Sequence, residues 1–351
     1  MPQRFVHRQR LQFEGELTRG EIEQIASNPA VKVLQCSTPV PAQTWELLNE
    51  ILFSSRLDIE LRLYGFYSLV CDLSFLKRVA NVRRFSADCL TDAVGIEHLA
   101  ALVHLEKLAV GVYHLEDFDF LNSIPDGIQS LTLTSTKSKK PRLDALVRFH
   151  SLRTLYLEKQ QQGIEVLAQL PTLEDVTLRS ISTENLEYVS GLPHLLSLDI
   201  KLGGIRDFSA IAKKESIKYL ELWQIRGLSV LRFISSLTGL QYLFLQSLRS
   251  VIEIPDLSRL TKLRRLHLEN MKGLVDVSAI SKAPALEYFS HVSAQNISLQ
   301  QYKDLLPMPT LKRVHVGFGS RKKNNEFEEL AIRHAKNLDP DSGFPQGFVF
   351  V

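Results

Sequence analysis

A short apolar pattern recurs along almost the whole chain. It consists of an apolar residue, two residues of any type, a second apolar residue, one further residue and a third apolar residue, as in LRTLYL, LQYLFL and LRRLHL. Leucine fills most of these positions and makes up 58 of the 351 residues. The first positions of thirteen copies lie at 31, 58, 82, 105, 128, 152, 173, 195, 217, 240, 263, 286 and 311. This period of 21 to 27 residues indicates a repeat architecture.

The spacing within each copy predicts a short strand. Its last two apolar residues are two positions apart and therefore share one face of an extended segment. One copy can bury that face only against its neighbours, so we expect the copies to stack into a solenoid. Two copies are weaker, because the first position holds Asp58 in one and Arg8 in a possible fourteenth. Segments 163–171 and 229–239 have the spacing of short helices on the return path.

A second motif reads Asp, apolar, Ser, any residue, apolar. It begins at Asp72, Asp207, Asp256 and Asp276, and a variant with a second Asp in place of Ser begins at Asp117. Together the two motifs resemble the leucine-rich repeat family, in its short-repeat, internalin-like class. The resemblance implies an α/β fold, a right-handed solenoid with a parallel sheet on its concave face and short helices or turns on its convex face. It also implies that the aspartate segment opens the convex turn, where side-chain oxygens can cap backbone N–H groups.

The chain departs from the family in one column. Family repeats usually carry Asn eight residues after the first apolar position, where its side chain links adjacent turns. Here the column holds Gln160, Ile181, Gly203, Ile225, Leu248, Met271, Ala294 and Gly319. We therefore expect an irregular solenoid that is stabilised mainly by hydrophobic stacking.

Both ends of a solenoid expose core and need caps. We predict a capping strand and helix over 1–30, about thirteen repeats over 31–320, and a capping helix and tail over 321–351, as one array without a linker. Thr18 and Glu21 form a capping box for a helix over 19–28.

Further helices are expected inside and after the repeats. Segment 44–55 has the pattern of a fuller helix, and Phe327, Leu330, Ala331 and His334 share one face of a helix over 325–336. The apolar tail GFPQGFVFV either docks on the solenoid or binds a partner.

No pattern for catalysis or metal binding is present. The sequence has no HExxH, no GxxxxGK[ST], no GxSxG and no metal-spaced set of Cys and His. Cys36, Cys71 and Cys89 form no CxxC, so we expect small buried residues in a reducing compartment. His291 occupies a core position and is expected to be buried, whereas His267 and His315 lie too far apart to share a metal ion. We therefore predict no catalytic residues, no cofactor and no metal.

Charge and hydropathy narrow the class of partner. Lys and Arg number 42 against 39 Asp and Glu, a net charge of only +3, which argues against binding to nucleic acid or to an anionic membrane. The basic runs 137–142 and 321–323 are interpreted as solvated loops. The first residues contain no apolar signal segment, and no run of about 18 uncharged apolar residues follows. We expect a cytoplasmic monomer.

The candidate site lies on the concave face, where the strand residues that alternate with the core point. Between 217 and 290 these positions hold large aromatic and charged side chains: Tyr219, Glu221, Trp223, Tyr242, Phe244, Arg265, His267 and Tyr288. Tyr, Trp and Arg dominate the energy of protein interfaces, so we predict that this section binds a protein partner. A ladder of aromatics stacked between strands is the alternative.

Two further expectations concern this section. Its rim would be formed by the charged residues Asp199, Lys201, Glu269 and Arg313. Truncation of Trp223 or Tyr242 would weaken binding with little loss of stability. The predicted function is a non-enzymatic protein-binding scaffold. An alternative is a recognition, regulatory or inhibitory subunit that binds a partner enzyme. A third, an enzyme with its site on the irregular early repeats, lacks any supporting motif.

Overall fold

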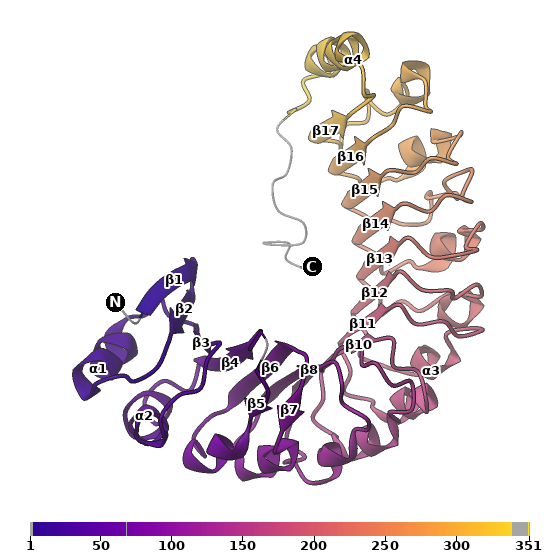
Figure 1. Cartoon of the computed structure of the whole chain (residues 1–351). Coiled ribbons are helices and arrows are strands. Elements are labelled where there is room, and N and C mark those ends of the chain that lie inside the picture. The colour runs from indigo at the N-terminus through magenta and orange to yellow at the C-terminus, as the bar shows by residue number, and fades with distance from the viewer. Residues whose placement is uncertain (1–2, 68, 339–349, 351) are drawn as a thin grey trace. The chain divides into compact units, whose positions relative to one another are not determined.

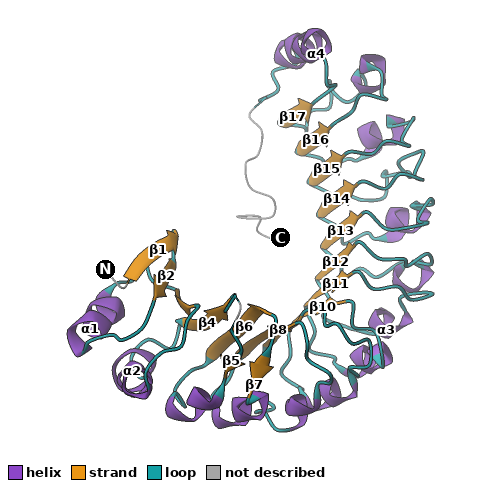
Figure 2. Cartoon of the chain, viewed as in Figure 1, coloured by secondary structure: helices purple, strands orange, loops and turns teal. Residues whose placement is uncertain are grey.

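The computed structural model describes residues 3–67, 69–338 and 350 (Figure 1). The chain divides into two compact units, Met1–Leu173 and Glu174–Val351. In each unit strands line one side, and turns and short helices line the other (Figure 2).

The first unit begins with a hairpin. Strand β1 (Gln3–His7) pairs antiparallel with β2 (Arg10–Phe13). From β2 onward the strands run parallel in chain order: β3 (Val33–Cys36), β4 (Glu60–Tyr64), β6 (Arg84–Leu90), β8 (Lys107–Val112), β9 (Ser130–Leu133) and β10 (Thr154–Glu158). Strands β5 (Cys71–Asp72) and β7 (Ala93–Val94) form a separate parallel pair.

Helices connect these strands. The early connections are α1 (Arg19–Ser27), α2 (Ala42–Leu47) and a π-helical segment η1 (Leu48–Phe53). The later ones are 3₁₀ turns: η2 (Ser74–Arg78), η3 (Ile96–Ala101), η4 (Asp119–Asn122), η5 (Asp144–Arg148) and η6 (Ile164–Gln169). The expected helix over 44–55 thus begins two residues earlier and changes to π geometry halfway.

The second unit continues the alternation. Its strands are β11 (Asp175–Arg179), β12 (Ser197–Lys201), β13 (Tyr219–Trp223), β14 (Tyr242–Gln246), β15 (Arg265–Glu269), β16 (Tyr288–Val292) and β17 (Arg313–Val316), all parallel to their neighbours. The return segments contain α3 (Glu187–Ser190), η7 (Ser209–Ile211), η8 (Arg232–Ser236), η9 (Ser278–Lys282), η10 (Leu299–Tyr302) and α4 (Arg321–Arg333). The long sheet contains fifteen strands among the described residues. This confirms the predicted solenoid of parallel strands and short helices.

The apolar rows form the core in the predicted register. Leu220, Leu243, Leu266 and Phe289 are paired across four consecutive strands and are fully buried. The copy at 58 is an exception, because Ile59 is buried in place of Asp58. The Asp58 carboxylate instead pairs with Arg56 and Lys32, each at 2.8 Å.

The aspartate motif acts as a local cap, as predicted. In each copy Oδ1 of the aspartate accepts a hydrogen bond from the backbone N–H two residues later, at 2.8 to 3.1 Å, for Asp72, Asp117, Asp207, Asp256 and Asp276. Acceptance of this bond lowers the pKa of the four aspartates that are followed by Ser. A carboxylate oxygen thus satisfies one N–H at the entrance to each short turn.

The column that lacks asparagine is filled by buried apolar side chains. Ile181, Leu248 and Met271 are fully buried, and Gln160 is the polar member, donating hydrogen bonds to Thr134 O and Thr136 Oγ1. The residue just before this column is left-handed after every strand from β10 to β16, with φ between 50 and 63° at Lys159, Ser180, Leu202, Gln224, Ser247, Asn270 and Ser293. None of these residues is a glycine, and no sequence pattern predicts this turn.

The predicted N-terminal capping box is present. The Thr18 hydroxyl accepts a hydrogen bond from the Glu21 N–H, and the Glu21 carboxylate accepts one from the Thr18 N–H at 2.8 Å. Helix α1 buries Ile22 and Ile25.

At the other end α4 packs on the last repeat through Phe327, which contacts the rings of Tyr302 and Phe318. The helix begins four residues before the expected position and therefore includes the basic run 321–323 in its first turn. His334 lies beyond its end and is exposed, in contrast to the expected face. Except for Phe350, the apolar tail lies outside the described residues. No helix in the described part of the chain is long and apolar enough to span a bilayer.

Candidate functional site

The eight predicted site residues lie together on one face of the second unit. Strand pairing places Tyr219 beside Tyr242, Tyr242 beside Arg265, and Arg265 beside Tyr288. The next row contains Glu221, Phe244 and His267, and the third row places Trp223 beside Gln246. We call the eight residues the aromatic section. Its four strands, β13 to β16, bring together side chains that are up to 69 positions apart in sequence.

Most of the aromatic section is buried, which differs from the expectation of an exposed face. Tyr242 is only 2% exposed, and Tyr219, Phe244 and Tyr288 are also buried. Trp223, Arg265 and His267 are half-buried. Truncation of a buried ring removes packing contacts, so loss of Tyr242 is expected to lower stability as well.

The burial comes partly from contacts between neighbouring strands. The Tyr219 and Tyr242 rings lie 5.5 Å apart between centroids, and Phe244 meets His267 edge to face at 4.7 Å. The Arg265 guanidinium lies 5.9 Å from the Tyr288 ring. The structure therefore contains the aromatic ladder, which is the alternative to binding.

Trp223 lies at the accessible edge of this ladder. Its ring has the Arg179 guanidinium at 5.7 Å and the Lys201 ammonium at 6.0 Å from its centroid. Cations at this distance from an indole face are attracted by the ring quadrupole. Trp223 thus connects the aromatic section to a group of charged side chains on β11 and β12.

These charged side chains surround a pocket that the sequence did not predict as a unit. Strand pairing places Thr177 beside Asp199 and Asp199 beside Glu221, with Asp175 in the adjacent row. The pocket has a volume of about 360 Å³ and is lined by Asp175, Thr177, Ser197, Asp199, Lys201, Tyr219, Glu221 and Phe350. We call it the carboxylate pocket. The acidic residues on three consecutive predicted strands, Asp175, Asp199 and Glu221, were the sequence signal that could have predicted this pocket.

The polar contacts in the carboxylate pocket are incomplete. The Lys201 ammonium lies 2.7 Å from Asp199 Oδ2 and 3.2 Å from Glu221 Oε1. Tyr219 donates its hydroxyl hydrogen to Glu221 Oε2 at 2.7 Å. The other oxygen of Asp199, Oδ1, is buried and has no hydrogen-bond partner.

Burial shapes the protonation of this pocket. Burial, with a contribution from the Glu221 carboxylate, raises the pKa of Asp199 to about 7 against the opposing effect of Lys201. Burial also raises the pKa of Asp175. Burial disfavours the charged form of Lys201, but its bonds to Asp199 and Glu221 outweigh this and raise its pKa. One ammonium group therefore faces three carboxyl groups.

The histidines and cysteines near the core show no shared metal site. His291 is fully buried, as predicted, with Nδ1 2.7 Å from the Tyr302 hydroxyl. In the described part of the chain no three His, Cys, Asp or Glu side chains are grouped to hold a metal ion. Cys36 and Cys71 are buried and free, whereas Cys89 is free but exposed, so the expectation of burial is wrong for this residue. Cys89 lies within β6, at the register shift between Ala87 and Leu90, in a left-handed conformation with φ 54°.

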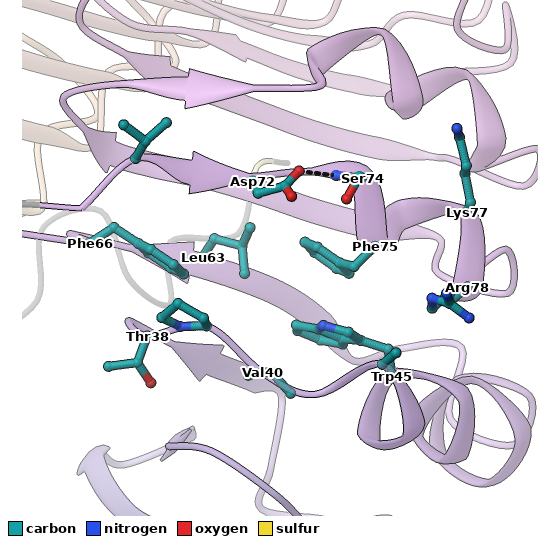
Figure 3. A pocket seen from close by; sticks show the side chains of 13 residues that line it. Thr38, Val40, Trp45, Leu63, Phe66, Asp72, Ser74, Phe75, Lys77 and Arg78 are labelled. Atoms are coloured by element: carbon teal, nitrogen blue, oxygen red, sulfur yellow. Dashed lines mark hydrogen bonds between the residues drawn. The ribbon is translucent and has the colours of Figure 1, made fainter.

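A second pocket lies within the first unit (Figure 3). It has a volume of about 480 Å³, and its walls include Leu63, Phe66 and the rings of Trp45 and Phe75, which stack 4.0 Å apart between centroids. The Asp72–Ser74 hydrogen bond lies at its edge. It is distant in sequence from the predicted site.

Solved structures with a similar fold cover most of the chain. An internalin, InlF from Listeria monocytogenes, matches with a TM-score of 0.58 at 21% identity, covering 85% of this chain and 88% of its own. A leucine-rich repeat protein of Leptospira interrogans matches with a TM-score of 0.57 at 16% identity, covering 92% and 81%. TLR13, solved in complex with ssRNA13, matches with a TM-score of 0.52 at 15% identity, covering 87% of this chain and 56% of its own.

No protein-family model matches the sequence, and no curated protein does. The solved structures share the alternation of parallel strands and short return segments over 85% or more of the chain. With the predicted repeat register present in both units, the protein is a leucine-rich repeat protein in its fold, similar to the internalins.

Proposed function

We propose that this protein is a non-enzymatic scaffold that binds a protein partner on the strand face of its second unit. Leucine-rich repeat folds are typically protein-binding. The observation that carries the proposal is the half-buried Trp223, set between a packed aromatic ladder and a group of charged side chains. Interface anchors have this form, because a rigid aromatic is held by its neighbours and offers its remaining area to the partner.

Burial divides the aromatic section into supporting residues and residues that can contact a partner. The buried aromatic members support the others by packing beside them; they are Tyr219, Tyr242, Phe244 and Tyr288. Trp223, Arg265 and His267 keep part of their surface and would contact the partner directly. A rigid support lowers the entropy lost on binding, because the anchor side chains are already ordered.

Affinity capture from the native cell, followed by mass spectrometry, tests the proposal. Trp223→Ala and Arg265→Ala, each shown to be folded, should lose the partner that the wild-type protein enriches. Lys282→Glu, an exposed change on η9 at the opposite side of the repeat, is the control and should retain it. The reverse result would place the functional surface on the helical side. An enzyme as the enriched partner would favour a regulatory or inhibitory role.

We further propose a cytoplasmic location. All three cysteines are free thiols. Burial raises the pKa of Cys36 and raises that of Cys71 to about 12, so both remain protonated and unreactive at neutral pH. Fractionation of the native cell with antibodies to the protein would test this location.

A further inference from the structure

We propose that the carboxylate pocket binds the guanidinium group of an arginine side chain presented by the partner. The inference rests on the proposed binding function and names the chemistry that one part of the strand face would recognise. It involves β11, β12 and β13, next to Trp223.

An unused acceptor is the first observation. Asp199 is 9% exposed, and its Oδ1 lies buried without a hydrogen-bond partner although Oδ2 is bonded to Lys201. A buried acceptor that has given up water and gained no donor is costly, so few such atoms persist in folded proteins. A ligand that donates a hydrogen bond would remove this cost.

The balance of charge is the second observation. Asp175, Asp199 and Glu221 come from three adjacent strands, and among the described residues that line the same pocket Lys201 is the one basic side chain. The ammonium already bonds two of these carboxylates, and the second oxygen of Asp199 still has no hydrogen-bond donor. The pocket therefore favours a second positive group.

The size of the pocket favours an organic cation over a compact ion. Its volume of about 360 Å³ far exceeds that of one water molecule, whose share of the liquid is about 30 Å³. Guanidinium carries five donors in a flat fork and is more weakly hydrated than ammonium, so it can bond oxygens on separate strands at a lower desolvation cost.

Aromatic surface beside the acids is the third observation. The Trp223 ring already lies near two cationic side chains, and Phe350 lines the pocket itself. Guanidinium stacks on aromatic faces while its edges bond carboxylates. The combination of acids and rings distinguishes this pocket from a solvated acidic surface.

The two tryptophans allow a direct test. The 351-residue chain contains two tryptophans, Trp45 and Trp223, so labelling with ¹⁵N-tryptophan gives two indole N–H signals, one in each unit. The peptide acetyl-Gly-Arg-Gly-amide is titrated against the labelled protein. The control peptide replaces arginine with citrulline, which has nearly the same shape and no charge.

We expect the Trp223 signal to shift and saturate with the arginine peptide while the Trp45 signal stays in place. The citrulline peptide should bind at least tenfold more weakly, because buried charge pairs account for the difference. Asp199→Asn should weaken the arginine peptide by tenfold or more, and Asp175→Asn serves as the second variant if the first does not fold. Asp256→Asn, an exposed acid on the helical side, should bind like the wild type.

Equal binding of the two peptides, no shift of Trp223, or unchanged binding by both pocket variants would overturn the proposal. Tighter binding of the corresponding lysine peptide would overturn the assignment to guanidinium. Failure of the arginine-binding pocket is distinguishable from failure of the proposed scaffold function. Loss of captured partner in Trp223→Ala but not in Asp199→Asn would leave the scaffold standing and remove the pocket.

Discussion

The phenol of Tyr219 donates a 2.7 Å hydrogen bond to the carboxylate of Glu221, two residues further along β13. Side chains two apart on a strand share one face, and both residues are only 6% exposed. Burial of this pair raises the pKa of the Tyr219 phenol, so it remains a donor over the whole physiological range.

This bond predicts a measurable cost for a small change. Tyr219→Phe keeps the ring but leaves Glu221 Oε2 without its donor, and we expect a loss of about 1–3 kcal/mol in the free energy of unfolding. Urea unfolding measures the change. Tyr113→Phe, at a tyrosine that is 48% exposed, is the matched control and should have little effect. An equal response of the two variants would mean that the buried bond contributes nothing.

The central apolar row should be the most sensitive to truncation. Leu243 and Leu266 are paired in register and fully buried, so Leu→Ala at either position should destabilise the protein by about 2–5 kcal/mol. Val230→Ala, at a side chain that is 65% exposed, should change stability by less than about 0.5 kcal/mol. Denaturant unfolding of the three variants provides the comparison, and a loss below about 1 kcal/mol for both leucines would contradict the core assignment.

His291 should make stability depend on pH between about 6.5 and 4. Burial lowers its pKa to about 4, so the folded state holds the neutral ring while the unfolded chain takes up a proton below about 6.5. The stability contributed by the neutral ring is present above pH 6.5 and is lost as pH falls through this window, by about 2–3 kcal/mol. Below pH 4 both states are protonated and no further loss follows.

A variant isolates this effect. Asp199 titrates in the same window with the opposite sign, because its raised pKa makes the folded state more stable at low pH. The informative quantity is therefore the difference between wild type and His291→Leu, measured by urea unfolding at pH 7, 6, 5 and 4. We expect this difference to shrink as pH falls. For the exposed control His334→Gln, the difference in the free energy of unfolding from the wild type should be the same at each pH.

Phe327 should hold α4 on the last repeat. Its ring is 1% exposed and packs on Tyr302 and Phe318, so Phe327→Ala should cost about 3–5 kcal/mol. Hydrogen exchange should then show faster exchange in α4 and β17 with little change in the first unit, since repeats couple mainly to their neighbours. Ile332→Ala, on the exposed side of the same helix, is the control. Protection of α4 that survives Phe327→Ala would show that the helix is held by other contacts.

The sequence alone determined the repeat register and the core. Leu243 and Leu266 could be assigned because every repeat must bury the same positions against its neighbours, so one local pattern is tested many times along the chain. Local interactions were also readable, including the Thr18–Glu21 capping box and the aspartate caps, since each closes within a few residues. The positions of the aromatic section on adjacent strands followed from the same register.

Tertiary structure decided what the register could not. Ile59 replaces Asp58 in the core because a shift by one residue avoids burial of a carboxylate. The burial of Tyr242 depends on the rings beside it, and the unused oxygen of Asp199 depends on where Lys201 places its ammonium. Repetition of a local pattern specifies which residues face inward. How side chains on the other face cover or bond one another depends on the conformation of each side chain and on neighbours more than 20 positions away, and only packing in three dimensions settles it.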